Sequence, residues 1–321
     1  MKEIQPLALF VVGPTASGKS ALALEIAERL GGAIINADSM QLYQELHIIT
    51  ARPSPADEAR APHLLYGVRE AAEAASVAWW RDAALVAMEK ARAAGRLPII
   101  CGGTGMYCAA LTQGLAAIPP IPAPAREEAR RLLAEEGPAA LHARLAAADP
   151  ASAARLRPSD SQRIARAYEV WRGTGRGIAA WQAEASAAPA PWRFAAILLD
   201  PPRDRLRDAI AKRWAAMMAE GAVAEVQALL AQGLDPSLPA MRALGVPEIA
   251  GLLAGRMTAE EASARAILAS GQYTKRQATW FRHHELAPPE RTYIINARFT
   301  SLAQFSESES AEFFAFLDFI R

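Results

Sequence analysis

Continuous apolar runs that end at glycine or proline recur along the chain and predict buried strands. The first run is "LALFVV" at residues 7–12, followed directly by Gly13. Similar runs are "AIINAD" at 33–38, "LPIICGG" at 97–103 and the Pro-flanked "APAPWRFAAILLDPP" at 188–202. We expect these segments to lie within one parallel sheet that is covered on both faces.

Helical periodicity separates the first three runs. "SALALEIAERL" at 20–30 stops at a pair of glycines, and "WWRDAALVAMEKARAAG" at 79–95 ends in another glycine. Because strands and helices alternate, the pattern predicts an α/β fold with a P-loop NTPase-like core, a parallel sheet flanked by helices.

The pattern changes after "GLAAIPPIPAPA" at 114–125, a proline-rich stretch. Between 126 and 184 there are helical segments and no buried strand run. We therefore predict an all-helical insertion at 118–190 within a core formed by 1–117 and 191–321. From residue 204 onward we expect helices alone.

Composition narrows the class of protein without naming a partner. The 321 residues are 52% apolar and 21% charged, which is typical of a globular chain, and the net charge is only +1. The two cysteines, Cys101 and Cys108, predict no disulfide framework, and we interpret both as packing residues. With no signal-peptide layout and no membrane-length apolar run, we expect a cytoplasmic protein.

"GPTASGKS" at 13–20 matches the phosphate-loop pattern G-x-x-x-x-G-K-[ST], between a predicted strand and a predicted helix. Glycines allow successive N–H groups to face one anion, and the helix N-terminus adds a favourable dipole. Lys19 supplies charge and Ser20 a hydroxyl for Mg²⁺. Alone, the loop favours a nucleoside triphosphate such as ATP. The candidate phosphate-binding residues are Gly13, Pro14, Thr15, Ala16, Ser17, Gly18, Lys19 and Ser20.

Asp38 ends the second predicted strand, at the sheet edge where open α/β folds bind ligands. It fits three roles: a helix cap, a Mg²⁺ ligand in a kinase, or a general base. In "IICGGTGMY" the third strand ends on glycines and Thr104, where many P-loop enzymes carry an aspartate. We interpret this end as a channel wall where a flat substrate passes close to the backbone.

Two basic segments are candidates for RNA binding. "SQRIARAYEVWR" places Arg163 and Arg166 on one helix face, and "YTKRQATWFRHH" at 273–284 mixes basic and aromatic residues. Such mixtures suit splayed RNA bases and phosphates. The alternative is an amphipathic helix with buried aromatics and solvated charges.

The blocks "GPTASGKS", "INADSMQLYQEL", "TARP", "CGGTGMY", "DSQRIARAYEV" and "KRQATWFR" occur in the order of the tRNA dimethylallyltransferase family, which the chain resembles over residues 13–282. The resemblance implies transfer of a dimethylallyl group from dimethylallyl diphosphate to N6 of the adenosine 3′-adjacent to the anticodon, in tRNAs that read codons starting with U. The product would be N6-isopentenyladenosine. It also implies Mg²⁺, a monomer, and a helical insertion that contacts the anticodon stem.

By motif match, Asp38 would be the general base, and Thr104 and Arg213 would join it at the catalytic site. Thr15, Lys19 and Ser20 would contact the diphosphate, and Arg213 would help hold it. The residues that the resemblance assigns to tRNA binding are Asp38, Ser39, Met40, Gln41, Thr104, Arg126, Gln162, Arg163, Ile164, Ala165, Arg166, Arg242, Ala243, Leu244, Gly245, Lys275, Arg276, Gln277, Trp280, Phe281 and Arg282.

The sequence departs from the family pattern at "HIITARP", where His47, Ile49 and Arg52 replace an acid, a glycine and a lysine, and at Val246-Pro247. Because Ile49 does not easily adopt a positive φ, we expect the local backbone to change. Three other functions stay open: prenyl transfer to a free adenine nucleotide, a small-molecule kinase, and an RNA-binding P-loop protein without catalysis.

Overall fold

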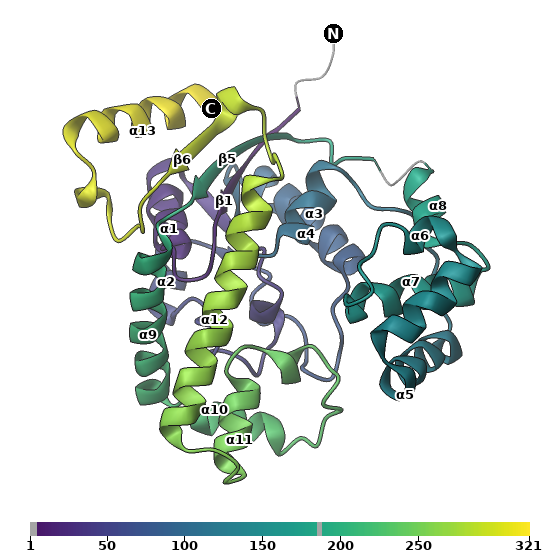
Figure 1. Cartoon of the computed structure of the whole chain (residues 1–321). Coiled ribbons are helices and arrows are strands. Elements are labelled where there is room, and N and C mark those ends of the chain that lie inside the picture. The colour runs from purple at the N-terminus through teal and green to yellow at the C-terminus, as the bar shows by residue number, and fades with distance from the viewer. Residues whose placement is uncertain (1–4, 185–187) are drawn as a thin grey trace. The chain divides into compact units, whose positions relative to one another are not determined.

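The computed structural model describes residues 5–184 and 188–321 (Figure 1). The chain divides into two compact units. The core unit comprises Met1–Thr112 and Ala190–Arg321, and the insertion unit comprises Gln113–Pro189. The insertion was predicted at 118–190, and its residues 185–187 lie outside the described residues.

The core unit is built on one sheet of six parallel strands in the order β3-β2-β4-β1-β5-β6. The strands are β1 (Leu7–Val12), β2 (Gly32–Asn36), β3 (His63–Leu64), β4 (Leu97–Gly102), β5 (Arg193–Leu199) and β6 (Thr292–Ile295). The four predicted strands are confirmed, as is the α/β fold class.

The prediction that the chain is helical from residue 204 onward is wrong at "TYII", which forms edge strand β6 and pairs with β5. The two-residue strand β3 was also missed. Both lie at sheet edges and are only partly buried, so neither shows the apolar run that marks a central strand.

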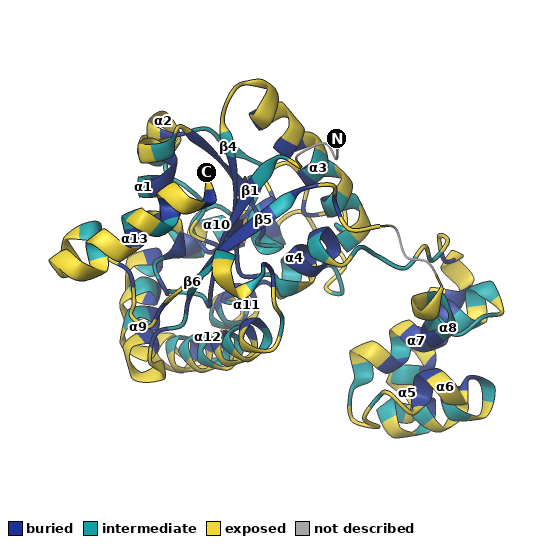
Figure 2. Ribbon diagram, turned by 90° about the horizontal axis from the view of Figure 1, so that it is seen from above, coloured by how far each residue is buried: buried dark blue, intermediate teal, exposed yellow. Residues whose placement is uncertain are grey.

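Side chains of β1 alternate between the two faces of the sheet and help to form a core on each. Phe10 packs in the cluster with α3 (Val77–Ala93) and α4 (Gly105–Thr112). Leu9 packs with α1 (Lys19–Leu30) and the C-terminal α13 (Glu307–Ile320). Figure 2 shows the strands as the buried centre of this unit.

A third apolar cluster joins the segment around Tyr43–Ile49 to helices that follow β5. Trp214 and Ile249 are among its buried members. The remaining helices of the core unit are α2 (Pro55–Arg60), α9 (Arg203–Glu220), α10 (Ala222–Leu230), α11 (Val246–Leu253) and α12 (Ala259–Arg282). Short 3₁₀ helices are η1 (Met40–Leu42), η2 (Ala240–Arg242), η3 (Pro289–Arg291) and η4 (Leu302–Gln304).

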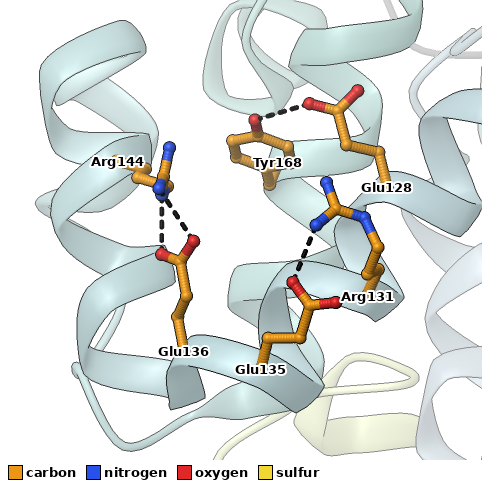
Figure 3. Close-up of polar contacts among 6 residues, drawn as sticks. All are labelled: Glu128, Arg131, Glu135, Glu136, Arg144 and Tyr168. Carbon is orange, nitrogen blue, oxygen red and sulfur yellow. Dashed lines mark hydrogen bonds and ion pairs between the residues drawn. The ribbon is translucent and has the colours of Figure 1, made fainter.

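The described residues of the insertion unit form helices and no strand, as predicted. Its helices are α5 (Ala123–Ala148), α6 (Pro150–Ala153), α7 (Ser161–Thr174) and α8 (Ile178–Ala183). Gly137 has φ 81° and precedes Pro138, so α5 is kinked there. Leu141 and Ile164 are fully buried in the unit's own core, and polar contacts such as Tyr168 to Glu128 lie around it (Figure 3).

Within the described residues, none of the helices combines the length and apolar character that crossing a membrane requires.

Candidate active site

The loop between β1 and α1 needs glycine at two positions because neighbouring backbone lies against it. A Cβ on Gly13 would lie 2.6 Å from the carbonyl oxygen of Leu199, at the end of β5. A Cβ on Gly18 would lie 2.0 Å from the carbonyl oxygen of Phe299, beyond β6. Both glycines also have positive φ, 155° and 93°. The loop therefore packs closely against the end of β5 and against the segment that follows β6.

The inner side of this loop offers groups that suit an anion. The first-turn N–H groups of α1 have no intrahelical partners, and the N-cap residue Gly18 has no side chain that could cap them. The buried hydroxyl of Ser17 has no hydrogen-bond partner among the described residues. Burial lowers the pKa of the Lys19 ammonium, while the charge of Asp38 opposes that shift. A bound phosphate group would satisfy these donors together.

Asp38 lies just beyond β2 and is held through one carboxylate oxygen. Oδ1 accepts from the amide of Met40 at 3.0 Å, and the Asp38 amide donates to Oδ1 of buried Asn36 at 2.8 Å. Among the described residues, Oδ2 has no hydrogen-bonded partner. The N-cap of η1 is Ser39, so Asp38 is not the cap itself. Its bond from Met40 uses Oδ1, and the general-base role would use Oδ2, so the structure accommodates both.

Thr104 lies beside Asp38 because β4 is the neighbour of β2 in the sheet. The Thr104 amide donates to the carbonyl of Ala37 at 3.1 Å, and Thr104 Oγ1 accepts from the amide of Ser39 at 3.0 Å. Two sequence motifs separated by 65 residues thus meet at the carboxyl ends of adjacent strands.

The glycines at the end of β4 make room for the protein's own atoms, while our interpretation of this strand end as a channel wall for a flat substrate stays a prediction. A Cβ would lie 2.2 Å from the Ala37 backbone at Gly102, 2.1 Å from Gln277 Nε2 at Gly103, and 2.2 Å from the Trp280 ring at Gly105. The last two contacts come from α12, so this helix packs directly on the candidate site.

Helix α12 contributes three inward-facing residues. Gln277 is buried and bonds to the loop and to β4, and Trp280 stacks on His284 with ring centroids 4.1 Å apart. Burial raises the pKa of Tyr273 to about 12, and the charge of Asp38 acts in the same direction. Tyr273 therefore stays a neutral hydrogen-bonding group next to the carboxylate.

Arg213 reaches the site from α9. Its Nη2 donates to the carbonyl of Thr50 at 3.0 Å. Burial lowers the pKa of its guanidinium, with Asp38 opposing the shift. Since the Asp38 charge acts on both Arg213 and Lys19, these three ionisable groups lie within electrostatic reach of one another.

The segment that carries Thr50 is fixed by a carboxylate from α10. Glu225 accepts from the amides of His47, Ile48 and Ile49 at 2.8, 2.7 and 2.9 Å. The positive φ in this segment falls on Ala51, at 50°, and not on Ile49. The Ile49 side chain instead packs against Gly245, where a Cβ would lie 2.6 Å from Ile49 Cδ1. The isoleucine that replaces the family's glycine at position 49 thus contributes to packing.

Two family models match the chain. The model for IPP transferase matches residues 41–284, and the model for isopentenyl transferase matches residues 7–66. The chain belongs to the IPP transferase family.

Relatives of the chain agree with this assignment. A tRNA dimethylallyltransferase from Granulibacter bethesdensis is 59% identical and covers 98% of each chain. One from Acidiphilium cryptum is 58% identical over 97% of this chain and 94% of the relative. The solved structure of a tRNA isopentenylpyrophosphate transferase from Bacillus halodurans has a TM-score of 0.68 at 29% identity, covering 98% of this chain and 96% of its own.

In this IPP transferase, the residues assigned to tRNA by motif fall into three groups by exposure. The exposed residues are Arg126, Gln162, Arg163, Arg166, Arg242, Lys275, Arg276 and Arg282. The buried residues are Ile164, Ala243, Gly245, Gln277 and Phe281. The buried residues pack within their own units and hold the elements that carry the exposed ones. Ser39, Met40, Gln41, Ala165, Leu244 and Trp280 are partly buried.

Three of the exposed arginines already have carboxylate partners. Arg163 pairs with Asp160, Arg166 with Glu169, and Arg282 with Asp200 through two bonds of 2.7 Å. Lys275 and Arg276 have no ion pair among the described residues.

Sequence reasoning missed Glu225 and Asn36. It placed Tyr273 in a segment proposed for RNA binding and did not predict its place near Asp38. Glu225 stands in the apolar run "AVAEVQALL", and a lone acid there is a weak signal for a partly buried carboxylate that binds backbone amides. Its partners lie more than 170 residues away, which no local pattern predicts.

Proposed function

We propose that this protein transfers the dimethylallyl group of dimethylallyl diphosphate to N6 of the adenosine 3′-adjacent to the anticodon, in tRNAs that read codons starting with U. The product is N6-isopentenyladenosine. The observation that carries the proposal is the meeting of the phosphate loop, Asp38, Thr104 and Arg213 at the carboxyl ends of β1, β2 and β4. The names of the relatives support the same activity.

The diphosphate is held by the loop of residues 13–20, with Lys19 and Arg213 supplying positive charge. Thr15 contacts it through its hydroxyl, since its amide already donates to Gln277. These donors are fixed before the reaction, so they stabilise the charge that grows on the leaving oxygen.

Asp38 is the general base. The N6 nitrogen of adenine forms a bond to the allylic carbon as the carbon–oxygen bond to diphosphate breaks. The N6 proton passes to Oδ2 of Asp38, the oxygen without a partner among the described residues. Thr104, bonded to the amide of Ser39, lines the same strand ends beside the reacting base.

The donor set fits Mg²⁺ as a partner of the diphosphate rather than as an all-protein metal centre. The described residues contain no group of three or more His, Cys, Asp or Glu that could hold a metal ion. Ser20 lies exposed in the first turn of α1, and the buried Ser17 hydroxyl of the same loop has no partner among the described residues. Ser20 Oγ with diphosphate oxygens is the hard-oxygen set that Mg²⁺ prefers, and the ion neutralises phosphate charge when bound.

The tRNA anticodon arm is bound by the exposed basic residues on α12 and near η2, and by those of the insertion unit, which contacts the anticodon stem. The target adenine leaves its stack to reach Asp38, as in other enzymes that modify bases. We place this reaction in the cytoplasm, supported by the free thiols of Cys101 and Cys108, and we propose that the protein acts as a monomer.

The test is a transfer assay with purified protein, labelled dimethylallyl diphosphate, Mg²⁺, unmodified tRNA and no ATP. We expect label on tRNA, and weak competition by AMP. Label on AMP alone would assign the protein to free-nucleotide transfer. A requirement for ATP with phosphorylation of a small molecule would contradict the proposal.

A further inference from the structure

We propose that Gln277 is a positioning residue that clamps the diphosphate loop to β4 and α12, and that it does not contact RNA. This inference rests on the proposed function, and it reassigns a residue that the motif alone places with tRNA binding.

The carboxamide of Gln277 joins three elements. Its Oε1 accepts from the amide of Thr15 in the loop at 2.8 Å. Its Nε2 donates to the carbonyl of Gly103, just beyond β4, at 3.0 Å. The side chain is 4% exposed, so both bonds form away from water, where leaving either partner unpaired is costly.

The surroundings of Gln277 are shaped to receive it. A Cβ on Gly103 would lie 2.1 Å from Gln277 Nε2, so only glycine leaves space for the carboxamide. One turn further along α12, Trp280 covers Gly105 in the same way. These residues face the loop and β4, whereas Lys275 and Arg276 are exposed to solvent. The RNA-facing and loop-facing sides of α12 are therefore different.

The loop requires such a clamp because Ala16 has a φ of 66°, in the left-handed region that residues with a Cβ seldom adopt. Such a conformation persists where neighbouring contacts enforce it. On one side, Gln277 holds the amide of Thr15. On the other, Phe299 donates its amide to the carbonyl of Ser17 at 2.8 Å, and Arg298 Nε donates to the carbonyl of Ala16 at 3.1 Å. Removing Gln277 frees one side of the strained segment.

The experiment replaces Gln277 with methionine, which has a similar length but makes neither hydrogen bond. The dissociation constant of dimethylallyl diphosphate with Mg²⁺ is measured without RNA, and that of unmodified tRNA without diphosphate. We expect the diphosphate affinity to fall by about tenfold, since two hydrogen bonds that set the loop are lost. We expect the tRNA affinity to change by less than about twofold.

Gln272→Met is the matched control, since it makes the same chemical change at an exposed position of the same helix. It should leave the diphosphate affinity unchanged. A second variant, Gln277→Glu, keeps an acceptor for Thr15 but loses the donor to Gly103 and adds negative charge near the diphosphate. Gln277→Glu should lose more diphosphate affinity than Gln277→Met. Folding of both variants is checked by circular dichroism, and Gln277→Glu is used for the test if Gln277→Met does not fold.

A loss of tRNA affinity with unchanged diphosphate affinity would make Gln277 an RNA contact and overturn the proposal. Unchanged affinity for both ligands in the folded variants would overturn it as well. If the unmodified protein neither binds dimethylallyl diphosphate nor modifies tRNA, the proposed function itself is contradicted. This result is seen without any variant, so it can be told apart from a failure of the proposal about Gln277.

Discussion

Asp38 is bonded through one carboxylate oxygen, so its structural contact and its proposed role as a base fall on different atoms. Its Oδ1 accepts from the Met40 amide at the start of η1, and its backbone is tied to buried Asn36. This leaves Oδ2 as the oxygen available to take a proton from adenine. A variant that keeps the first contact and removes only basicity would therefore separate the two roles.

Asp38→Asn is that variant, because an asparagine Oδ1 still accepts from Met40 while the amide cannot act as a base. We expect turnover to fall by about 10²–10⁴-fold. The melting temperature and the affinity for dimethylallyl diphosphate should stay close to those of the unmodified protein. Unchanged turnover in steady-state assays would leave Asp38 with a structural role alone, through its bond from the Met40 amide.

At the residue scale, the sequence predicted the phosphate loop, Asp38 and Thr104, because each lies in a short motif at the end of a recognisable strand. It did not predict what Gln277 and Glu225 bind. Their partners are separated from them by 174 to 262 residues, and a side-chain hydrogen bond across such a distance depends on the finished packing.

Among the elements, α12 is the one whose packing decides the shape of the site. Its side chains Gln277 and Trp280 pack against Gly103 and Gly105, the glycines that follow β4. Since no Cβ fits there, packing of α12 explains Gly103 and Gly105 in the motif "CGGTG", and the Ala37 backbone explains Gly102.

Two glycine substitutions test this packing. Gly105→Ala should lower the free energy of unfolding by about 1–3 kcal/mol, because the new methyl meets the Trp280 ring at 2.2 Å. Gly271→Ala, within α12, has nothing within 4 Å of the new methyl and should stabilise by about 0.5–1 kcal/mol. Both values come from urea unfolding, and equal effects of the two substitutions would refute the packing argument.

The segment that carries Thr50 gives a second prediction at this scale. Glu225→Ala leaves the amides of His47, Ile48 and Ile49 without their acceptor, so the Thr50 carbonyl no longer fixes Arg213. We expect KM for dimethylallyl diphosphate to rise by about tenfold, from the lost charged hydrogen bonds. Glu220→Ala, at an exposed site on the end of α9, is the control.

Combining Glu225→Ala with Arg213→Lys sharpens this prediction. Because Glu225 acts through the position of Arg213, the double variant should lose less than the sum of the two single losses. Strict additivity in steady-state kinetics would show that the two residues act separately.

The elements themselves were predictable wherever burial gives a clear pattern. The inner strands of the sheet can be recognised in the sequence as apolar runs; they are β1, β2, β4 and β5. β6 escaped prediction because an edge strand with Ile294 52% exposed has no such run, and its place is set by pairing with β5.

For the whole molecule, net charge is nearly neutral, so RNA affinity has to come from local basic surface. On α12, Lys275 and Arg276 have no ion pair among the described residues, whereas Arg282 is engaged by Asp200. Lys275 and Arg276 are therefore available to bind a phosphate, whereas Arg282 first has to leave its carboxylate partner.

Salt titrations of tRNA binding measure this difference. Lys275→Ala and Arg276→Ala should each weaken binding and reduce the slope of log affinity against log salt by about one. Arg282→Ala should change the slope less, because its guanidinium first has to leave Asp200. The same slope change for all three variants would contradict the distinction.

The central claim, that this chain prenylates a tRNA adenosine with dimethylallyl diphosphate, is tested most directly by mass spectrometry of tRNA nucleosides. Unmodified tRNA is incubated with dimethylallyl diphosphate and Mg²⁺, with the protein, without it, or with Asp38→Asn in its place. We predict N6-isopentenyladenosine in the sample with unaltered protein, and a far slower appearance with Asp38→Asn. Adenosine without an added isopentenyl group after incubation with unaltered, folded protein would contradict the account.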